Sequence, residues 1–318
     1  MDRPRTVEMR VHEENEEAGL PVRAALHPDG LYLMLKPIGV KQLQDSFMQQ
    51  TIARINAPAS LLRAPLRKDF DAGSAPNGLI FHVGRCGSTL LSQLLKQSEG
   101  VAVYAEPMPL NELLAPPHKH AREEIVAALR GLGEAFARHS GGRYVLKCSS
   151  WATLYADIIT EAFPQTPWAV RVLDPREVGV PCLIEAAPRF RRETEQGREI
   201  ARRADPANQA SSHEQYFARL FAACCEAVLR LDRTRGRLIE YETLPAAVWE
   251  SLAPHFGLPA DAAVRAKMTA AAHVDVKAQT ARPFAPDSGR KRAMASDELR
   301  EAVDAIARPA LARLRSPA

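Results

Sequence analysis

Short apolar runs alternate with longer segments of helical periodicity in the central part of the chain. The apolar runs cover residues 79–82, 101–105, 143–147, 167–173 and 238–241. Segments in which apolar residues recur every three or four positions lie between them, for example 122–140 and 151–163. Strands that alternate with helices through short connections predict a parallel sheet that is covered by helices.

The first 75 residues follow a different pattern. Residues 21–39 indicate one or two short strands with a turn at 28–30, and residues 41–55 fit a helix with its apolar side chains on one side. We therefore predict an N-terminal appendage of short strands and a helix, residues 1–75. The main α/β domain, residues 76–318, then follows and ends in a helical C-terminal part.

The break between the first apolar run and the next helix has the sequence GRCGST. Its residues are Gly84, Arg85, Cys86, Gly87, Ser88 and Thr89. A strand that leads through glycines into a helix directs backbone N–H groups and the positive helix end toward an anion. Arg85 adds a charged, forked donor, and Ser88 or Thr89 adds a hydroxyl and caps the helix. The loop therefore predicts an anion-binding site.

The spacing of this loop differs from that of loops that bind nucleoside triphosphates, which read GxxxxGK[ST]. Gly87 follows Gly84 after three positions, and no lysine precedes Ser88. An ATP-dependent kinase or nucleotidase is therefore the less favoured alternative. We do not expect Cys86 to act as a nucleophile, because no histidine lies in the motif.

Polar residues also follow the other predicted strands. Glu106 follows the second apolar run, Lys147 ends the third, and Asp174 and Arg176 follow the fourth. Because ligands bind at the carboxyl ends of parallel strands, we expect these residues to meet the glycine loop at one edge of the sheet. Lys147 ends an apolar strand, so it either contacts a ligand or pairs with a neighbouring acid.

Composition narrows the classes of partner. The 318 residues carry a net charge of +4, which does not indicate nucleic acid but is compatible with a small anionic ligand. The five cysteines have no zinc-ligand spacing, so we expect reduced thiols, no metal site and a cytoplasmic location. The N-terminus is too polar for a signal peptide, and no apolar run approaches the roughly 20 residues that a membrane helix needs.

Several segments resemble, in the same order, the sulfotransferases that use 3'-phosphoadenosine 5'-phosphosulfate (PAPS). They are GRCGSTLLSQLL, AVYAEPMPL, RYVLKCSSWATLYADIITEAFPQTPWAVRVLDPREVGV and LIEYETLPAAVWESLAPHFGLP, with a weaker likeness in DSGRKRAM. The resemblance covers residues 78–182 well and 237–300 loosely. It implies a three-layer fold like that of P-loop nucleoside triphosphate hydrolases. It also implies PAPS as donor, no metal, and a hydroxyl or amine acceptor on a small molecule or saccharide.

The same resemblance implies roles for individual residues. The loop, residues 84–89, would hold the 5'-phosphosulfate, and Arg85 stands where the family has a catalytic lysine or arginine. Glu106 stands where several members have a catalytic glutamate, so we take it as the base, and Lys147 is a third catalytic candidate. The remaining candidates for the nucleotide are Asp174, Arg176, Arg290 and Lys291.

The segment after the fourth strand departs from the family pattern. Leu173 stands in place of the arginine, and Pro181 in place of the serine, that commonly hold the 3'-phosphate. Arg176 or the basic loop at 289–291 is the candidate source of the missing charge, and Arg171 should point to the same side as Leu173 because strand residues alternate. A non-catalytic member that keeps the anion site is therefore the other alternative. The sequence indicates neither the acceptor nor the oligomeric state.

Overall fold

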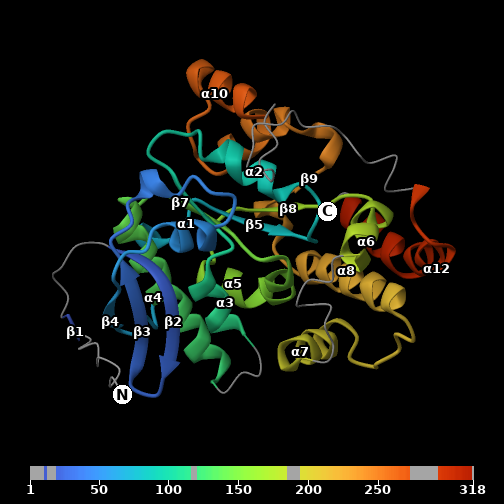
Figure 1. Cartoon of the computed structure of the whole chain (residues 1–318), viewed down its shortest axis with the longest axis horizontal. Helices are drawn as coiled ribbons and strands as arrows, with labels where there is room; N and C mark the ends of the chain where they lie inside the picture. The colour runs from blue at the N-terminus through green and yellow to red at the C-terminus, as the bar shows by residue number, and fades with distance from the viewer. Residues whose placement is uncertain (1–10, 13–18, 116–119, 185–193, 273–292, 317–318) are drawn as a thin grey trace, which may run out of the picture.

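A parallel sheet of five strands forms the centre of the computed structural model, which describes residues 11–12, 19–115, 120–184, 194–272 and 293–316 (Figure 1). The strands, in spatial order, are β6 (Ala102–Ala105), β7 (Tyr144–Lys147), β5 (Gly78–His82), β8 (Trp168–Arg171) and β9 (Gly236–Ile239). All neighbouring pairs are parallel. The predicted order of strands along the chain is therefore confirmed, although the last strand begins and ends two residues earlier than expected.

Helices cover both faces of this sheet, which makes three layers (Figure 1). On one face, Ile80, Val103 and Val145 pack with residues of α2 (Ser88–Leu95), α9 (Ala253–His255) and α10 (Ala262–Ala272). The other face packs against α3 (Met108–Leu114), α4 (Arg122–Ser140), α5 (Ala156–Ala162) and α8 (His213–Leu229). The strands β5, β6, β7 and β8 are buried on both faces and consist mainly of apolar residues, which explains the continuous apolar runs. The predicted fold class is confirmed.

The longest described helix, α4, has the bounds that its sequence pattern predicts. Glu124 accepts a hydrogen bond from the backbone N–H of Ala121 at the start of the helix (2.9 Å). Gly141 ends the helix in the left-handed conformation, with φ of 69°, which glycine adopts at little cost. Local sequence signals were sufficient here because both ends of the helix are capped by residues of the helix itself or its neighbours.

The N-terminal residues form a second, four-stranded sheet. Its spatial order is β1 (Val11–His12), β4 (Ser60–Ala64), β3 (Gly30–Lys36) and β2 (Leu20–His27). The hairpin of β2 and β3 agrees with the predicted turn at residues 28–30. The strand β4 was missed, because its sequence is short and partly exposed and gains its partners only from β3 and β1.

The helix predicted over residues 41–55 is wrong in its first half. A short 3₁₀ turn covers Val40–Gln42, and the α-helix α1 begins at Met48 and ends at Arg54. The Asp45 carboxylate accepts hydrogen bonds from the side chains of Thr51 (2.7 Å) and Arg54 (2.8 Å). These bonds hold residues 43–47 as an irregular segment rather than a helical turn.

Both sheets share one hydrophobic core. The N-terminal sheet lies on α3 and α4, and its buried Leu20, Leu31 and Leu33 belong to the same cluster as Leu79 of β5. Polar contacts add to the packing, since the Glu112 carboxylate in α3 accepts a hydrogen bond from the backbone N–H of Ala24 (2.7 Å). The boundary after residue 75 therefore separates two sheets that pack together. The division into an N-terminal appendage and a main domain stays a prediction.

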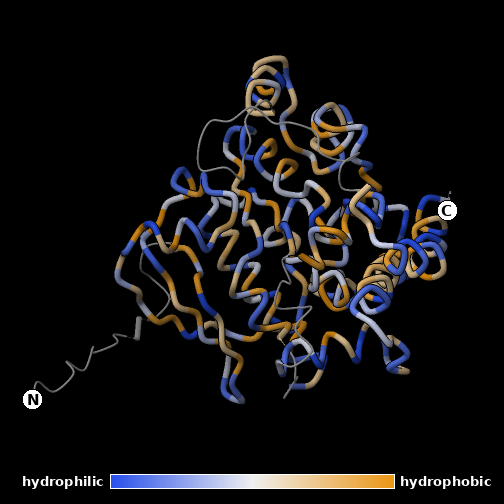
Figure 2. The backbone as a smooth tube through the Cα atoms, turned by 45° about the vertical axis from the view of Figure 1, so that its right-hand side comes forward, coloured by the Kyte–Doolittle hydropathy of each residue, from blue (hydrophilic) through white to orange (hydrophobic). Residues whose placement is uncertain are grey.

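The C-terminal part is helical in the residues that the structure describes. It contains α12 (Asp297–Ala302) and α13 (Arg308–Arg315), which pack against α8; α6 (Pro175–Ile184) and α7 (Glu195–Ala204) precede α8 in the chain. Figure 2 shows that the helices near the C-terminus mix hydrophilic and hydrophobic residues. Within the described ranges, no helix has both the length and the apolar character needed to cross a membrane.

Candidate active site

The loop between β5 and α2 has the backbone of an anion cradle. Gly84 and Gly87 adopt positive φ values of 84° and 88°. A Cβ atom at Gly87 would lie 3.1 Å from the Tyr241 ring, so both the conformation and the space require glycine. The prediction that Ser88 or Thr89 caps α2 is wrong, because Gly87 is the N-cap and no side chain in the described chain caps this end. No side-chain cap in the described residues therefore uses the backbone donors at the start of α2, where Gly87, Ser88 and Thr89 line a cavity.

A cavity of about 460 Å³ lies in front of this loop. All six residues from Gly84 to Thr89 line it, together with His82 and Glu106. The cavity is also lined by Ser150, which follows β7, and by Cys182 of α6. The structure thus brings the carboxyl ends of β5, β6 and β7 together at one edge, as the strand order predicted.

Glu106 and Lys147 form an ion pair at the end of β6 and β7. The Lys147 Nζ atom lies 2.6 Å from Glu106 Oε1, and its side chain is fully buried. The nitrogen also lies 5.0 Å from the centre of the Phe47 ring. Of the two alternatives for Lys147, the structure shows the pair with an acid, and that acid is the candidate base.

His82 holds the same carboxylate from the other side. Its Nδ1 accepts a hydrogen bond from the Gly84 N–H (3.1 Å), so in the neutral ring Nε2 carries the proton. That Nε2–H donates to the carbonyl oxygen of Cys148 (3.0 Å) and lies 3.6 Å from Glu106 Oε1. His82 therefore connects the glycine loop to the Glu106–Lys147 pair.

These contacts set the charge of Glu106. Burial raises the pKa of Glu106, but the Lys147 ammonium and the His82 side chain more than offset this and hold the pKa well below its usual range. The carboxylate is therefore ionised at any physiological pH. It can accept a hydrogen bond from a hydroxyl or amine, while it is a weak base until its surroundings change.

Two residues of the cavity have strained backbones. Arg85 and Glu106 adopt positive φ values of 50° and 54°, which side chains with a Cβ atom rarely do. Each such residue costs on the order of 1 kcal/mol or more, and such strain tends to occur at functional sites. Both residues line the cavity, where Arg85 is exposed and Glu106 is partly buried.

The Cys86 thiol lies inside the loop and is completely buried. Its Sγ donates to the carbonyl oxygen of Arg171 (3.4 Å). Burial raises the pKa of Cys86, but His82 and the Arg171 guanidinium outweigh this effect and bring the pKa to about 7. The groups that lower the pKa of this thiol thus lie at the ends of two strands, His82 in β5 and Arg171 in β8.

Asp174 and Arg176 do not line this cavity. Asp174 accepts a hydrogen bond from the backbone N–H of Arg176 (2.8 Å) at the start of α6, and Arg176 pairs with Asp304 (2.5 Å). Arg290 and Lys291 lie outside the residues that the structure describes. The charge expected for the far end of the nucleotide is therefore not brought to the cavity by Asp174 or Arg176.

Sequence reasoning did not identify the role of Arg171. This arginine ends β8, is fully buried, and lies 5.2 Å from the Tyr241 ring centre. The expectation that it shares a side with Leu173 stays a prediction, because β8 ends at Arg171 and the alternation of strand residues does not extend to Leu173, which packs in the core. A signal was present in the sequence, since an arginine inside an apolar strand requires a buried partner or function.

The N-terminal appendage supplies one wall of the cavity, which the sequence did not indicate. The residues are Ser46, Phe47 and Gln50. The segment is held against α2, because Gln93 Nε2 donates to the carbonyl oxygen of Gln44 (3.2 Å) and Lys96 donates to that of Asp45. No local pattern in residues 44–50 signals this docking.

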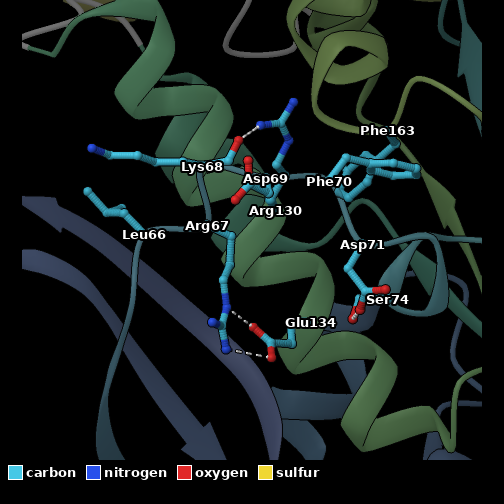
Figure 3. Close-up of a pocket in the computed structure, with 10 residues that line it drawn as sticks. All are labelled: Leu66, Arg67, Lys68, Asp69, Phe70, Asp71, Ser74, Arg130, Glu134 and Phe163. Atoms are coloured by element: carbon cyan, nitrogen blue, oxygen red, sulfur yellow. Dashed lines mark hydrogen bonds and ion pairs between the residues drawn. The ribbon is translucent and has the colours of Figure 1, made fainter.

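A second cavity, of about 500 Å³, is lined by residues that precede strands of the sheet, and so lies at the opposite edge. Figure 3 shows the side chains that line it. Its lining includes Ser74, which precedes β5, and Phe163, which precedes β8. Arg67 forms two hydrogen bonds with Glu134, at 2.6 and 2.8 Å, so these charges neutralise each other. This cavity has no glycine loop, and we place the candidate site at the carboxyl edge. No group of three or more His, Cys, Asp or Glu residues in the described chain could hold a metal.

Comparisons with known proteins give structural likeness alone. No family model matches the sequence, and no curated protein matches it. The fold is similar to a sulfotransferase from Alicyclobacillus acidocaldarius (TM-score 0.45, 18% identity, 76% of this chain and 94% of that chain). It is also similar to the sulfotransferase domain of the Synechococcus PCC 7002 olefin synthase (TM-score 0.45, 15% identity, 76% of this chain and 97% of that chain). A sulfotransferase from Mycobacterium avium gives a TM-score of 0.44 and 14% identity over 79% of this chain and 76% of that chain. Because this likeness is low, the reaction must be argued from the residues of the site.

Proposed function

We propose that this protein transfers a sulfuryl group from PAPS to a hydroxyl or amine of a small molecule or saccharide. The observation that carries the proposal is one cavity that joins a glycine-loop anion cradle to an ionised, strained glutamate. The cradle suits the leaving phosphate, and the glutamate suits the acceptor. PAPS supplies the activated sulfuryl group, and the chain supplies positioning and charge.

The glycine loop is the proposed donor side. Charge moves to the bridging oxygen of the phosphate during such a transfer, so fixed donors near that oxygen lower the barrier. The backbone N–H groups at the start of α2 and the hydroxyls of Ser88 and Thr89 are suited to hold the phosphate. Arg85, an exposed residue that lines the cavity, adds a permanent positive charge that can stabilise negative charge on the sulfuryl group during its transfer.

Glu106 is the proposed acceptor-side residue. Its low pKa means that it orients the acceptor by accepting a hydrogen bond, and that it takes the proton late, when the attacking oxygen has lost most of its basicity. Lys147 and His82 fix the carboxylate in this position, at 2.6 and 3.6 Å from Oε1. They are therefore positioning residues for the proposed base.

Ser46, Phe47 and Gln50 face the same cavity as Glu106 and are the proposed acceptor wall. An aromatic ring beside hydroxyl and amide groups suits a small molecule that has both an apolar face and polar substituents. The volume of about 460 Å³ must also hold part of the donor, so a large acceptor could enter only with one end.

Thermal unfolding with three ligands tests the donor. We expect adenosine 3',5'-bisphosphate to stabilise the full chain by about 2.7 kcal/mol at 100 times its dissociation constant, and ADP with magnesium to have little effect. Preference for ADP with magnesium would instead support the kinase alternative.

Radiolabelled PAPS with panels of phenols, sugars and amines then tests transfer. Binding without transfer to any class would favour a non-catalytic member.

Substitution of Arg85 tests the loop directly. We expect Arg85→Ala to reduce transfer by about 10²-fold or more, because charge stabilisation of the leaving group is a large contribution in such sites. Its matched control is Arg138→Ala on α4, whose arginine lies away from the cavity. Equal transfer by Arg85→Ala and the wild type would remove Arg85 from the mechanism.

A further inference from the structure

Arg171 is a buried cation with unused hydrogen-bond donors. Its side chain is 0% exposed. One terminal nitrogen donates to the carbonyl oxygen of Ile239 (3.0 Å) and to that of Val172. The other terminal nitrogen and Nε have no hydrogen-bond partner among the residues that the structure describes. Because buried donors are almost always paired in folded proteins, this arrangement requires an explanation.

The unpaired nitrogen lies directly behind the glycine loop. A Cβ atom at Gly87 would be 3.5 Å from it, and His82 at the end of β5 is the register partner of Arg171 in β8. Gly87 has no side chain, so only the loop backbone separates the guanidinium from the anion cradle. The charge of Arg171 can therefore act on an anion in the cradle through a few ångströms of protein with little screening by water.

No acid in the described chain forms an ion pair with Arg171. Glu240 is near in the sequence of β9, but both of its oxygens are bound by Arg315, at 2.7 and 2.9 Å. The neighbour on the remaining side is the Tyr241 ring. Arginine remains protonated when buried. Glu240, Glu242 and the Cys86 thiol favour this charge, but none of them forms a hydrogen bond with Nε or with the unpaired terminal nitrogen.

We propose that Arg171 is an anion-binding residue that acts from behind Gly87 and supplies charge for the phosphate of the sulfuryl donor. This inference rests on the proposed function for the identity of the ligand. It adds positive charge on the side of the 5'-phosphate, where the glycine loop lies. The anion in turn neutralises the buried guanidinium, so ligand binding and folding stability are coupled at this residue.

Isothermal titration of the full chain with adenosine 3',5'-bisphosphate tests the proposal, alongside thermal unfolding in sodium sulfate and in sodium chloride at equal ionic strength. We expect Arg171→Met to weaken bisphosphate binding by about tenfold to a hundredfold, as for the loss of a nearby charge in a poorly screened site. Arg171→Lys, which keeps a charge, should recover part of the affinity. Arg235→Met is the matched control, because Arg235 also has a buried nitrogen with no hydrogen-bond partner but lies at the opposite end of β9.

The outcomes separate the two proposals. Wild-type binding of the bisphosphate, unchanged in Arg171→Met, overturns the role of Arg171 and leaves the donor intact. Stabilisation by sulfate that depends on Arg171, without bisphosphate binding, supports the anion role and overturns PAPS as donor. Absence of both effects in the wild type overturns both proposals. A lower melting temperature of Arg171→Met with an undiminished ligand response would show a structural role alone and also overturn the inference.

A second measurement covers the case in which Arg171→Met does not fold. Wild-type protein labelled with ¹⁵N-arginine gives an Nε–H signal for Arg171, which is identified by its loss in Arg171→Lys. We expect this signal to shift when the bisphosphate is added, because the anion changes the field at the guanidinium. An unshifted signal at a saturating concentration of ligand overturns the proposal.

Discussion

Glu106 shows how one residue can combine position, charge and strain. It follows β6, and its positive φ of 54° directs the carboxylate to Lys147 and His82. The residue before a proline is restricted, and Pro107 follows it directly, so the conformation is costly. The packed ends of β6 and β7 hold it in place. Loss of the Glu106 charge is expected to slow the reaction and also to destabilise the fold, because the buried Lys147 ammonium would lose its partner.

The substitution Glu106→Gln tests that expectation. We expect unchanged bisphosphate affinity and a fall in transfer rate of about 10²- to 10⁴-fold, because the amide cannot take a proton. Glu134→Gln, in the cavity at the opposite edge, is the control and should transfer at the wild-type rate. A transfer rate for Glu106→Gln within a few-fold of the wild type would rule out its role as base.

The loop glycine Gly87 allows a second residue-scale test. Gly87→Ala should lower the free energy of unfolding by more than the about 1–2 kcal/mol that the left-handed conformation costs, because its Cβ would also meet the Tyr241 ring. It should also reduce bisphosphate binding. Gly141→Ala is the matched control, since Gly141 has φ of 69° and its Cβ would meet no atom within 4 Å. Equal effects of both substitutions in urea unfolding would show that Tyr241 adds no constraint.

At the scale of elements, the segment before α1 determines one side of the cavity. Residues 44–50 belong to the N-terminal part of the chain, yet Gln93 of α2 and its C-cap residue Lys96 hold them beside the glycine loop. Under the proposed function, the same helix α2 would hold the donor at its N-terminus and contact the acceptor wall with its side.

The substitution Phe47→Ala tests the acceptor wall. We expect the KM for any acceptor found by the transfer assay to rise about fivefold to tenfold, as for the loss of an aromatic contact of about 1 kcal/mol. The dissociation constant of adenosine 3',5'-bisphosphate should not change. Phe70→Ala, which removes an aromatic ring from the other cavity, serves as the control. A changed bisphosphate affinity with an unchanged acceptor KM would place Phe47 on the donor side instead.

At the scale of the whole molecule, a buried histidine connects the two sheets. His139 on α4 is bound by the hydroxyl of Tyr104 in β6 (2.6 Å) and contacts the carbonyl oxygen of Ile38, after β3 (2.7 Å). Burial lowers the pKa of His139, and the contact with the Ile38 carbonyl offsets this only in part. The imidazole is therefore neutral in the folded protein, with one nitrogen donating and the other accepting.

The stability of the whole chain should therefore fall in mild acid. Below about pH 6.5 the unfolded state binds a proton at His139 that the folded state excludes, so the free energy of unfolding falls with pH by at most about 1.4 kcal/mol per unit for this group. Urea unfolding at pH 7.5, 6.5 and 5.5 measures this slope. His139→Gln, which cannot titrate, should show a smaller slope, and equal slopes would exclude His139 as the cause.

Local patterns were sufficient for much of the fold. The apolar runs predicted the five strands of the parallel sheet, and the caps of α4 predicted its bounds, because these signals depend on residues close in sequence. Parallel topology then predicted that the glycine loop, Glu106 and Lys147 meet at one edge. The local patterns did not predict β4, which depends on pairing with β3. They also did not predict the irregular segment before α1, which depends on side-chain hydrogen bonds to Asp45.

The sequence by itself determined the α/β architecture, the glycine loop and the edge at which polar residues gather. Only the tertiary structure decided that two nitrogens of Arg171 lie behind Gly87 with no hydrogen-bond partner in the described chain. It also decided that Phe47 lines the same cavity as Glu106 and that Arg176 pairs with Asp304. The physical reason is the separation in sequence between the residues that determine each feature. Backbone conformation and strand order follow from local periodicity, whereas the partner of a buried charge is set by which distant elements pack against it.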